Sequence, residues 1–146
     1  MLETLQFLAT LSTALFCGAA IYINVAEQPS RRSLDSQSAA AQWAASYKRA
    51  TWMQAPLAIV GFVAGVCVWL LEGGLLWLIA GLLIGAAVPF TLIVIMPINQ
   101  RLLGRSVNQT QTPELLECWS RLHGIRTVLS AIATVLMLSR LLVAER

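Results

Sequence analysis

Apolar residues of this chain fall into four long blocks, and most of the charged residues lie in the stretches between them. The blocks cover residues 5–26, 52–71, 75–98 and 125–143. Each is close to the roughly 20 residues that an α-helix needs to cross the hydrocarbon core of a bilayer. The pattern therefore predicts four transmembrane helices, with both ends of the chain on the same side of the membrane.

Two short segments decide how these blocks begin and connect. Residues 1–6 carry Glu3 and no Lys or Arg, unlike the basic start of a cleaved signal peptide, so we expect the first block to be a retained helix. The second and third blocks together are too long for one crossing, and Glu72-Gly73-Gly74 lies between them. A Gly-Gly pair is typical of a turn, so the segment predicts a hairpin.

The stretch after the first block predicts a loop and then a further helix. Pro29 is expected to end the first helix, and residues 30–38 are predicted to form a polar loop. Residues 37–50 are rich in Ala and favour a helix, which either lies at the interface or forms the soluble start of the second span. The expected fold is all-α: a single domain over residues 1–146, built as a four-transmembrane-helix bundle with a short interfacial or extended helix after the first span.

The third block ends in a segment with two prolines. Pro89 and Pro97 lack backbone donors, which predicts a kinked, partly hydrated helix end. Residues 107–112 are predicted to form a polar loop. Pro113 followed by Glu114 is typical of a helix start, because the proline lacks only a donor that would have no partner there.

Glycines recur at a spacing of four residues in the two middle blocks, at Gly61 and Gly65 and again at Gly81 and Gly85. This Gly-x-x-x-Gly spacing lets helix backbones approach closely in lipid. We expect it to serve packing inside the bundle, with a homo-oligomer interface as the alternative.

Composition and charge agree with a membrane protein and set its orientation. Of 146 residues, 58% are hydrophobic and 12% are charged, about half the charged fraction of a soluble domain. Short loops rich in Lys and Arg stay in the cytoplasm. We therefore expect a multi-pass protein of a bacterial inner membrane with both termini outside, because one side holds only Arg140 and Arg146, whereas the other holds Arg31, Arg32, Lys48, Arg49, Arg101 and Arg105.

Polar residues inside the apolar blocks are the candidates for a functional site. Arg126 lies within the last block, where a charge costs about 2.5–3.5 kcal/mol and needs a partner or water. Glu27 is the acidic residue expected at a similar depth, so we predict that it contacts Arg126 directly or through His123. Because four helix ends meet on one face of the membrane, one polar layer can include Asn24, Glu27, Gln54, Thr91, Asn99, His123 and Arg126.

This layer has other interpretations. It could be a buried network that only fixes helix packing, with Arg126 reaching toward water. One His, one Glu and three scattered Cys fall short of a durable metal site, so no metal ligand is assigned. Haem held by a single axial histidine is a minor alternative. Nucleotide-binding loops, a Ser-His-Asp order and basic nucleic-acid patches are absent, so no nucleic-acid partner is expected.

Three short motifs carry a resemblance to a known family. They are Glu27-x-Pro29, then Pro89-Phe90-Thr91-x5-Pro97-x-Asn99, and Trp119-x3-His123-x2-Arg126. Together they resemble the anthrone-oxygenase-like family of small four-helix membrane proteins. Fungal members are associated with the oxidation of polyketide anthrones to anthraquinones by dioxygen, without a dedicated metal or flavin. Carried over to this chain, the resemblance implies catalytic roles for Glu27, Asn99, His123 and Arg126.

The implied chemistry suits these side chains. An anthrone carbon between two aromatic rings can lose a proton, and the resulting anion reacts with dioxygen. His123 could accept the proton while Glu27 orients it or shares the task, and Arg126 and Asn99 would stabilise the oxyanion. A flat substrate arriving from lipid would contact Trp119, Trp43, Tyr47, Asn24, Gln54 and Thr91, although the three aromatic residues could instead be interfacial anchors.

The sequence therefore favours a membrane-embedded, cofactor-independent oxygenase that acts on a hydrophobic phenolic or quinone-like molecule. Two alternatives stay open. One is a non-enzymatic membrane protein, such as a small-molecule-binding or accessory subunit, whose polar layer is structural. The other is a haem-binding bundle. The expected partners are the lipid bilayer, the hydrophobic small molecule and dioxygen, and a homo-oligomer is compatible with the sequence.

Overall fold

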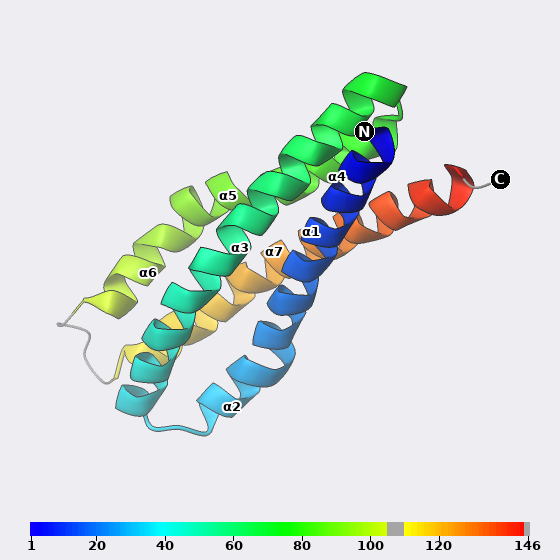
Figure 1. Cartoon of the computed structure of the whole chain (residues 1–146). Coiled ribbons are helices and arrows are strands. Elements are labelled where there is room, and N and C mark those ends of the chain that lie inside the picture. Colours follow the sequence, from blue (N-terminus) through cyan, green and yellow to red (C-terminus); the bar gives the residue numbers. More distant parts are fainter. Residues whose placement is uncertain (105–109, 145–146) are drawn as a thin grey trace.

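The computed structural model describes residues 1–104 and 110–144 of the chain, and all regular structure in these ranges is helical. Four helical segments are long and apolar enough to cross a membrane: Leu2–Arg32, Ser36–Glu72, Leu75–Leu103 and Thr112–Leu142. We call them the first to fourth spans. Figure 1 shows them side by side, with both termini at one end of the bundle. The predicted four-helix membrane fold is confirmed.

The first span passes through its proline without ending. It consists of α1 (Leu2–Tyr22), a π-helical turn η1 (Ile23–Glu27) and α2 (Gln28–Arg32). The prediction that Pro29 stops this helix is wrong. Proline lacks only a backbone donor, and in the π-helical turn the hydrogen-bond spacing changes from four residues to five, so the chain keeps its helical path. The predicted loop over residues 30–38 shrinks to residues 33–35.

The second span is one unbroken helix. Asp35 caps α3 (Ser36–Glu72), since its Oδ1 accepts hydrogen bonds from the backbone N–H groups of Gln37 at 3.0 Å and Ser38 at 3.1 Å. Hydrogen bonds from Ser38 and Gln37 hold the pKa of this exposed carboxyl below its ordinary value. Residues 37–50 belong to α3 itself, so of the two sequence expectations the extended helix is correct. Gly73 ends α3 with a positive φ of 76° and begins the predicted hairpin.

The third and fourth spans differ in regularity. The third consists of α4 (Leu75–Gly85), α5 (Ala87–Phe90), a second π-helical turn η2 (Thr91–Ile95) and α6 (Met96–Leu103). The fourth is the single helix α7 (Thr112–Ala144), which begins beside Pro113 and Glu114 as predicted. Most of the predicted loop over residues 107–112 lies outside the described residues.

Small residues bring the helices together at the end of the bundle that carries the termini. A Cβ atom added to Gly65 would lie 3.2 Å from the Cα atom of Gly81, so α3 and α4 touch backbone to backbone there. A Cβ atom on Gly85 would lie 2.7 Å from the ring of Phe62. The expectation that the Gly-x-x-x-Gly spacings serve packing inside the bundle is confirmed.

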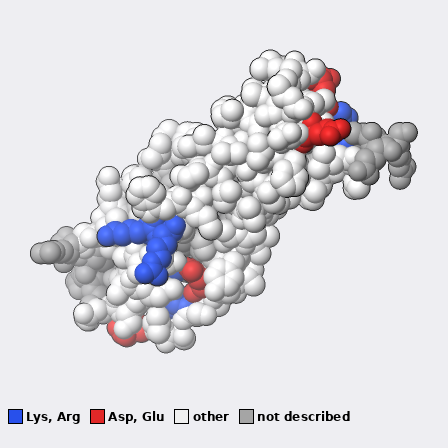
Figure 2. Space-filling view, viewed as in Figure 1, with Lys and Arg blue, Asp and Glu red and all other residues white. Residues whose placement is uncertain are grey.

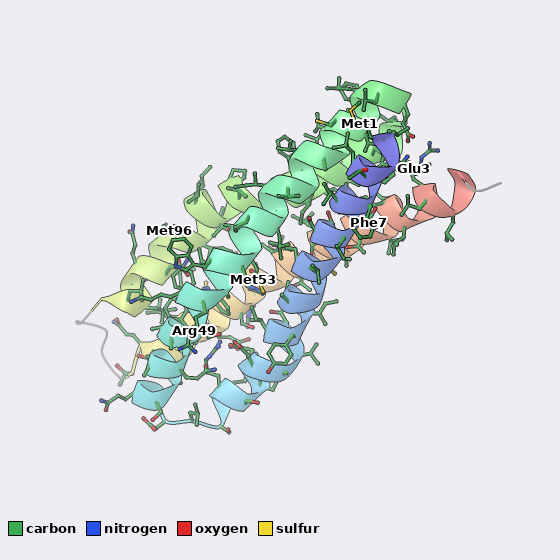
Figure 3. All side chains as sticks on the ribbon, in the orientation of Figure 1. Met1, Glu3, Phe7, Arg49, Met53 and Met96 are labelled. Atoms are coloured by element: carbon green, nitrogen blue, oxygen red, sulfur yellow. The ribbon has the colours of Figure 1, made fainter. Side chains whose placement is uncertain are left out.

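Charged side chains at the visible surface lie toward the two ends of the molecule. In the face shown in Figure 2, Lys, Arg, Asp and Glu atoms gather toward the two ends and leave a broad uncharged band between them. Figure 3 places Met1, Glu3 and Phe7 near one end and Arg49 toward the other. Such a band is what a multi-pass protein presents to the hydrocarbon core.

Candidate functional site

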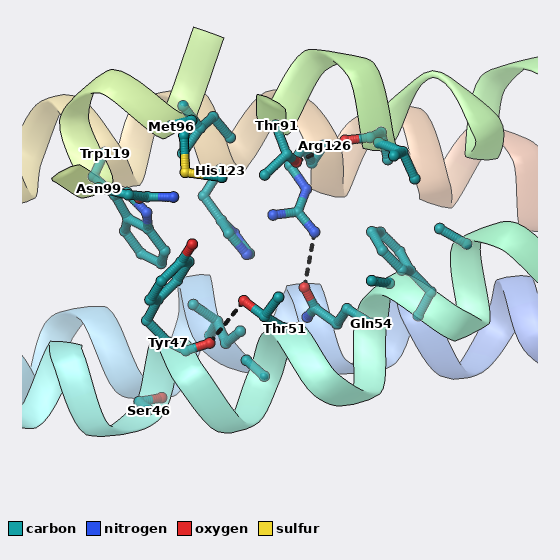
Figure 4. A pocket seen from close by; sticks show the side chains of 18 of the residues that line it. Ser46, Tyr47, Thr51, Gln54, Thr91, Met96, Asn99, Trp119, His123 and Arg126 are labelled. Carbon is teal, nitrogen blue, oxygen red and sulfur yellow. Dashed lines mark hydrogen bonds between the residues drawn. The ribbon is translucent and has the colours of Figure 1, made fainter. Parts of the chain in front are cut away.

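A cavity of about 120 Å³ lies between the four spans, at the level of the two π-helical turns. We call it the chamber. Figure 4 shows it with α3 and α6 in the foreground and side chains reaching in from opposite walls. Nine of the ten sequence-predicted site residues line it: Glu27, Trp43, Tyr47, Gln54, Thr91, Asn99, Trp119, His123 and Arg126. Nearly all of the residues that the sequence singled out therefore lie around one cavity, and their role in function stays a prediction.

The two π-helical turns, η1 and η2, belong to the first and third spans and both border the chamber. A π-helical turn inserts an extra residue into a helix, which changes the direction of the side chains that follow, and such turns are frequent at functional sites. Pro97 follows η2 and has no N–H to donate to the preceding turn. Pro29, Pro89 and Pro97 therefore lie within helical segments of the first and third spans and do not end these spans.

His123 is almost fully buried, with 1% of its surface exposed. Its Nδ1 atom lies 2.9 Å from Oδ1 of Asn24, and its ring stacks on Trp119 with a centroid separation of 4.9 Å. Asn24 does not line the chamber, and its Nδ2 donates to Oγ1 of Thr127 at 2.9 Å. In this structure Asn24 contacts the imidazole, and its contact with a substrate stays a prediction.

Arg126 reaches across the chamber to the second span. Its Nη2 donates to Oε1 of Gln54 at 2.8 Å, and its guanidinium carbon lies 5.2 Å from the centre of the Phe16 ring. This amide and this aromatic face serve as its partners in place of a carboxylate. Figure 4 shows the hydrogen bond to Gln54 beside the imidazole of His123.

The predicted contact between Glu27 and Arg126 is wrong. The Glu27 carboxylate pairs with Arg31 at 3.0 Å and accepts a hydrogen bond from Ser46 at 2.7 Å. Since the first span continues beyond Pro29, Arg31 stands one helical turn after Glu27 on the same face and takes the carboxylate. Glu27 still lines the chamber, but as half of a local ion pair.

Arg31 is the site residue that the sequence analysis missed, because it was assigned to a loop. It is 2% exposed, it donates to Gln28, Gln42 and Glu27, and its guanidinium carbon lies 5.7 Å from the centre of the Trp119 ring. The spacing of four residues between Glu27 and Arg31 was a signal for this pair. It could have been used only if the helix had been extended through the proline.

Some polar atoms at the chamber have no partner within the described part of the chain. Asn99 is 0% exposed, and neither its Nδ2 nor its Oδ1 has a hydrogen-bond partner there. The same holds for Nε2 of Gln54 and Nε of Arg126. Leaving a buried donor or acceptor unpaired costs about 1–3 kcal/mol. These atoms therefore mark where the polar groups of a ligand can be recognised.

The hydroxyl of Thr91 already has a hydrogen-bond partner, and the described residues hold no group of metal ligands. The hydroxyl of Thr91 donates to the carbonyl of Ala87 at 2.6 Å, so its proton serves the backbone of its own helix. Over residues 1–104 and 110–144, no three His, Cys, Asp or Glu side chains are grouped closely enough to hold a metal ion.

The aromatic residues form a connected wall. The rings of Trp43 and Tyr47 stack with centroids 5.0 Å apart, and Trp43 meets Trp119 edge to face at 5.8 Å. Trp43 and Trp119 are 0% and 5% exposed, and both line the chamber. Both indole rings are buried inside the bundle, whereas an interfacial anchor would lie at its surface; their contact with a flat ligand stays a prediction.

The fold and the chamber together define a multi-pass helical membrane protein with an aromatic-walled polar site inside its bundle. Residues 43–136 match the family model described as anthrone oxygenase, which is more than half of the chain. The chain belongs to this family. No curated protein and no solved structure matched it. The matched range includes Asn99, His123 and Arg126 but not the turn that carries Asn24 and Glu27.

Replacing Arg31 should destabilise the protein far more than replacing its neighbour Arg32. The side chain of Arg31 is 1% exposed in its pair with Glu27, whereas that of Arg32 is 59% exposed in its pair with Glu117. We expect Arg31→Met to lower the free energy of unfolding by about 3 kcal/mol, because it leaves a largely buried carboxylate without its cation. Arg32→Met should change it by less than about 1 kcal/mol. Unfolding in detergent measures both, and equal losses would contradict the assignment.

Proposed function

We propose that this protein is a membrane-embedded oxygenase that oxidises a flat, hydrophobic phenolic substrate of the anthrone type with dioxygen, using no resident metal or flavin. Membership of the anthrone oxygenase family supports the reaction class. The observation that carries the proposal is the unpartnered amide of Asn99, which lines the same aromatic-walled chamber as His123 and Arg126.

The first step is removal of a proton from carbon. Nε2 of His123, the ring nitrogen with no hydrogen bond among the described residues, accepts one proton from the CH₂ group of the substrate. The electron pair of the broken C–H bond delocalises onto the substrate carbonyl oxygen. The N–H groups of Asn99 and Arg126 donate to that oxygen and stabilise its negative charge. In the interior of a bundle these donors act with little competition from water.

The remaining steps balance without another reagent. The anion gives its electron pair to dioxygen, a C–O bond forms, and His123 returns its proton to the terminal oxygen, giving a hydroperoxide. His123 then accepts the second proton of the same carbon as the C=O bond forms and the O–O bond breaks. The departing hydroxide takes that proton. In sum, CH₂ and O₂ become C=O and H₂O, and the imidazole is regenerated.

The size of the chamber suggests how a larger substrate is held. A cavity of this volume is comparable to one of about 150 Å³ that accepts benzene, so it surrounds about one aromatic ring. The chamber lining continues to Thr51 on α3 and Leu92 on η2, and both residues are exposed. The other rings of a flat substrate would extend between these two helices toward the lipid.

The alternatives make different demands on the same residues. A purely structural polar layer, as in a non-enzymatic accessory subunit, would satisfy its own hydrogen bonds, whereas both amide atoms of Asn99 lack partners among the described residues. A haem-binding bundle would use His123 as an axial ligand. An ultraviolet-visible spectrum of the purified protein separates the haem alternative from our proposal.

Removing the imidazole should abolish turnover without unfolding the protein. We expect His123→Ala to lower kcat for anthrone oxidation by about 10²–10⁴-fold, the usual contribution of a general base. Oxygen consumption and quinone absorbance measure the rate, and circular dichroism checks the fold. Cys118→Ser is the control, since Cys118 is exposed and outside the chamber lining. Unchanged turnover in His123→Ala would remove the imidazole from the mechanism.

Replacing Asn99 should separate function from stability. In Asn99→Leu a buried amide without partners becomes an apolar side chain of similar size, so we expect the protein to become more stable, by about 1–3 kcal/mol. Turnover of an anthrone should fall at least tenfold, because an oxyanion donor is lost. Thermal unfolding and oxygen consumption are measured on the same preparation. A destabilised variant with normal turnover would indicate a structural role instead.

We also propose that the end of the bundle opposite the termini faces the cytoplasm of a bacterial cell. The end of the first span supplies Arg31 and Arg32 there, and the first part of α3 supplies Lys48 and Arg49. A periplasm-active reporter fused to the carboxyl terminus should be active, and a cytoplasm-active one should not. The reverse pattern would overturn this orientation.

A further inference from the structure

Three groups from two spans form a continuous hydrogen-bonded chain behind the imidazole of His123. The hydroxyl of Thr127 donates to the backbone carbonyl of His123, 3.2 Å away on the same helix. Its only hydrogen is used in that bond, so toward Asn24 the oxygen can act only as an acceptor. Nδ2 of Asn24 lies 2.9 Å from this oxygen and donates to it.

The amide of Asn24 therefore has one allowed orientation. With Nδ2 turned to Thr127, its Oδ1 faces His123 and lies 2.9 Å from Nδ1. A carbonyl oxygen can only accept, so Nδ1 must carry the ring proton. A neutral imidazole has one protonated nitrogen, which leaves Nε2 with a free electron pair.

The free nitrogen is the one turned away from Asn24. His123 lines the chamber and Asn24 does not, and Figure 4 shows the imidazole directed into the space between Asn99 and Arg126. We propose that Asn24 and Thr127 are positioning residues that fix the proton of His123 on Nδ1 and present Nε2 to the chamber as the base. The catalytic meaning of this arrangement rests on the proposed function, whereas the position of the proton does not.

Local structure places the positioning residues where they are needed. Asn24 is the second residue of the π-helical turn η1, so its direction depends on that irregularity in the first span. On the facing helix, a Cβ atom added to Gly124 would lie 3.8 Å from Nδ2 of Asn24. That is an ordinary van der Waals distance, so the amide packs closely against α7 at this residue.

A neutral amide suits this task better than a carboxylate would. A carboxylate at position 24 would also fix the proton on Nδ1, but its negative charge would stabilise the imidazolium in a medium of low dielectric. The proposed cycle requires the imidazole to give each proton back. An asparagine orients the ring and adds no charge, so it does not stabilise the imidazolium and does not hinder the return of its proton.

The chain contains one histidine, so its proton can be located directly. We would label histidine with ¹⁵N and record the imidazole signals of the protein in lipid nanodiscs at neutral pH, without substrate. We expect one neutral ring with protonated Nδ1 and unprotonated Nε2. A ring protonated at Nε2, or at both nitrogens, would overturn the proposal from the wild-type protein alone.

Paired variants test the two positioning residues. In Thr127→Val the acceptor for Nδ2 is lost and the amide can turn over, so we expect signals of both neutral forms; Thr127→Ser keeps the hydroxyl and should keep the wild-type spectrum. Asn24→Leu should also give both forms, and its kcat should fall by about 10–100-fold, as for other groups that orient a reacting side chain. An unchanged spectrum in both Thr127→Val and Asn24→Leu would refute the role of these residues.

The two proposals fail separately. If the spectra behave as expected but His123→Ala still oxidises an anthrone, the positioning pair stands and the oxygenase mechanism falls. If His123→Ala is inactive but the wild-type ring is protonated at Nε2, the requirement of turnover for the imidazole stands, whereas the positioning pair and the role of Nε2 as the base fall.

Discussion

A charge or hydrogen-bonding group inside a membrane bundle must find its partner within the protein, because lipid offers none. This constraint organises the site. Arg126 is held by Gln54 and the face of Phe16, Glu27 by Arg31 and Ser46, and His123 by Asn24. Apart from the pair of Glu27 and Arg31, which lies within the first span, each of these contacts joins two different spans. The amide of Asn99 differs, since it has no hydrogen-bond partner among the described residues, and it is the group to which we propose that the substrate binds.

The ion pair between Glu27 and Arg31 has a consequence for the chemistry of the chamber. Because Glu27 is neutralised one turn along its own helix, it does not neutralise Arg126. Among the described residues Arg126 therefore has no carboxylate partner, and beside His123 its guanidinium is hydrogen-bonded to a neutral amide. A cation in that position favours a substrate that becomes an anion, which is the requirement of carbanion chemistry with dioxygen.

Irregular backbone and functional position coincide in this bundle. Both π-helical turns lie at the level of the chamber, one carrying Asn24 and Glu27 and the other preceding Asn99. At the end with the termini, the crossing of Gly65 and Gly81 is tight, and the described cavity lies elsewhere. The helices thus pack closely at the end with the termini, and the cavity lies beside the π-helical turns.

Hydrophobic periodicity and block length were enough to determine four spans, the hairpin at Gly73 and the start of the last helix, because the thickness of a bilayer sets the length of each element. Most of the polar residues that line the chamber also followed from the sequence, since charged and amide groups within apolar blocks are rare, whereas Arg31 did not. Their pairing did not follow. Whether Glu27 meets Arg126 or Arg31 depends on whether the helix continues through Pro29, and that is decided by a π-helical turn and by packing against α3. Only the tertiary structure could therefore place Arg31 inside the site and Asn24 behind His123, because these contacts arise from the rotation of helices about their axes, which a linear pattern of residues does not specify.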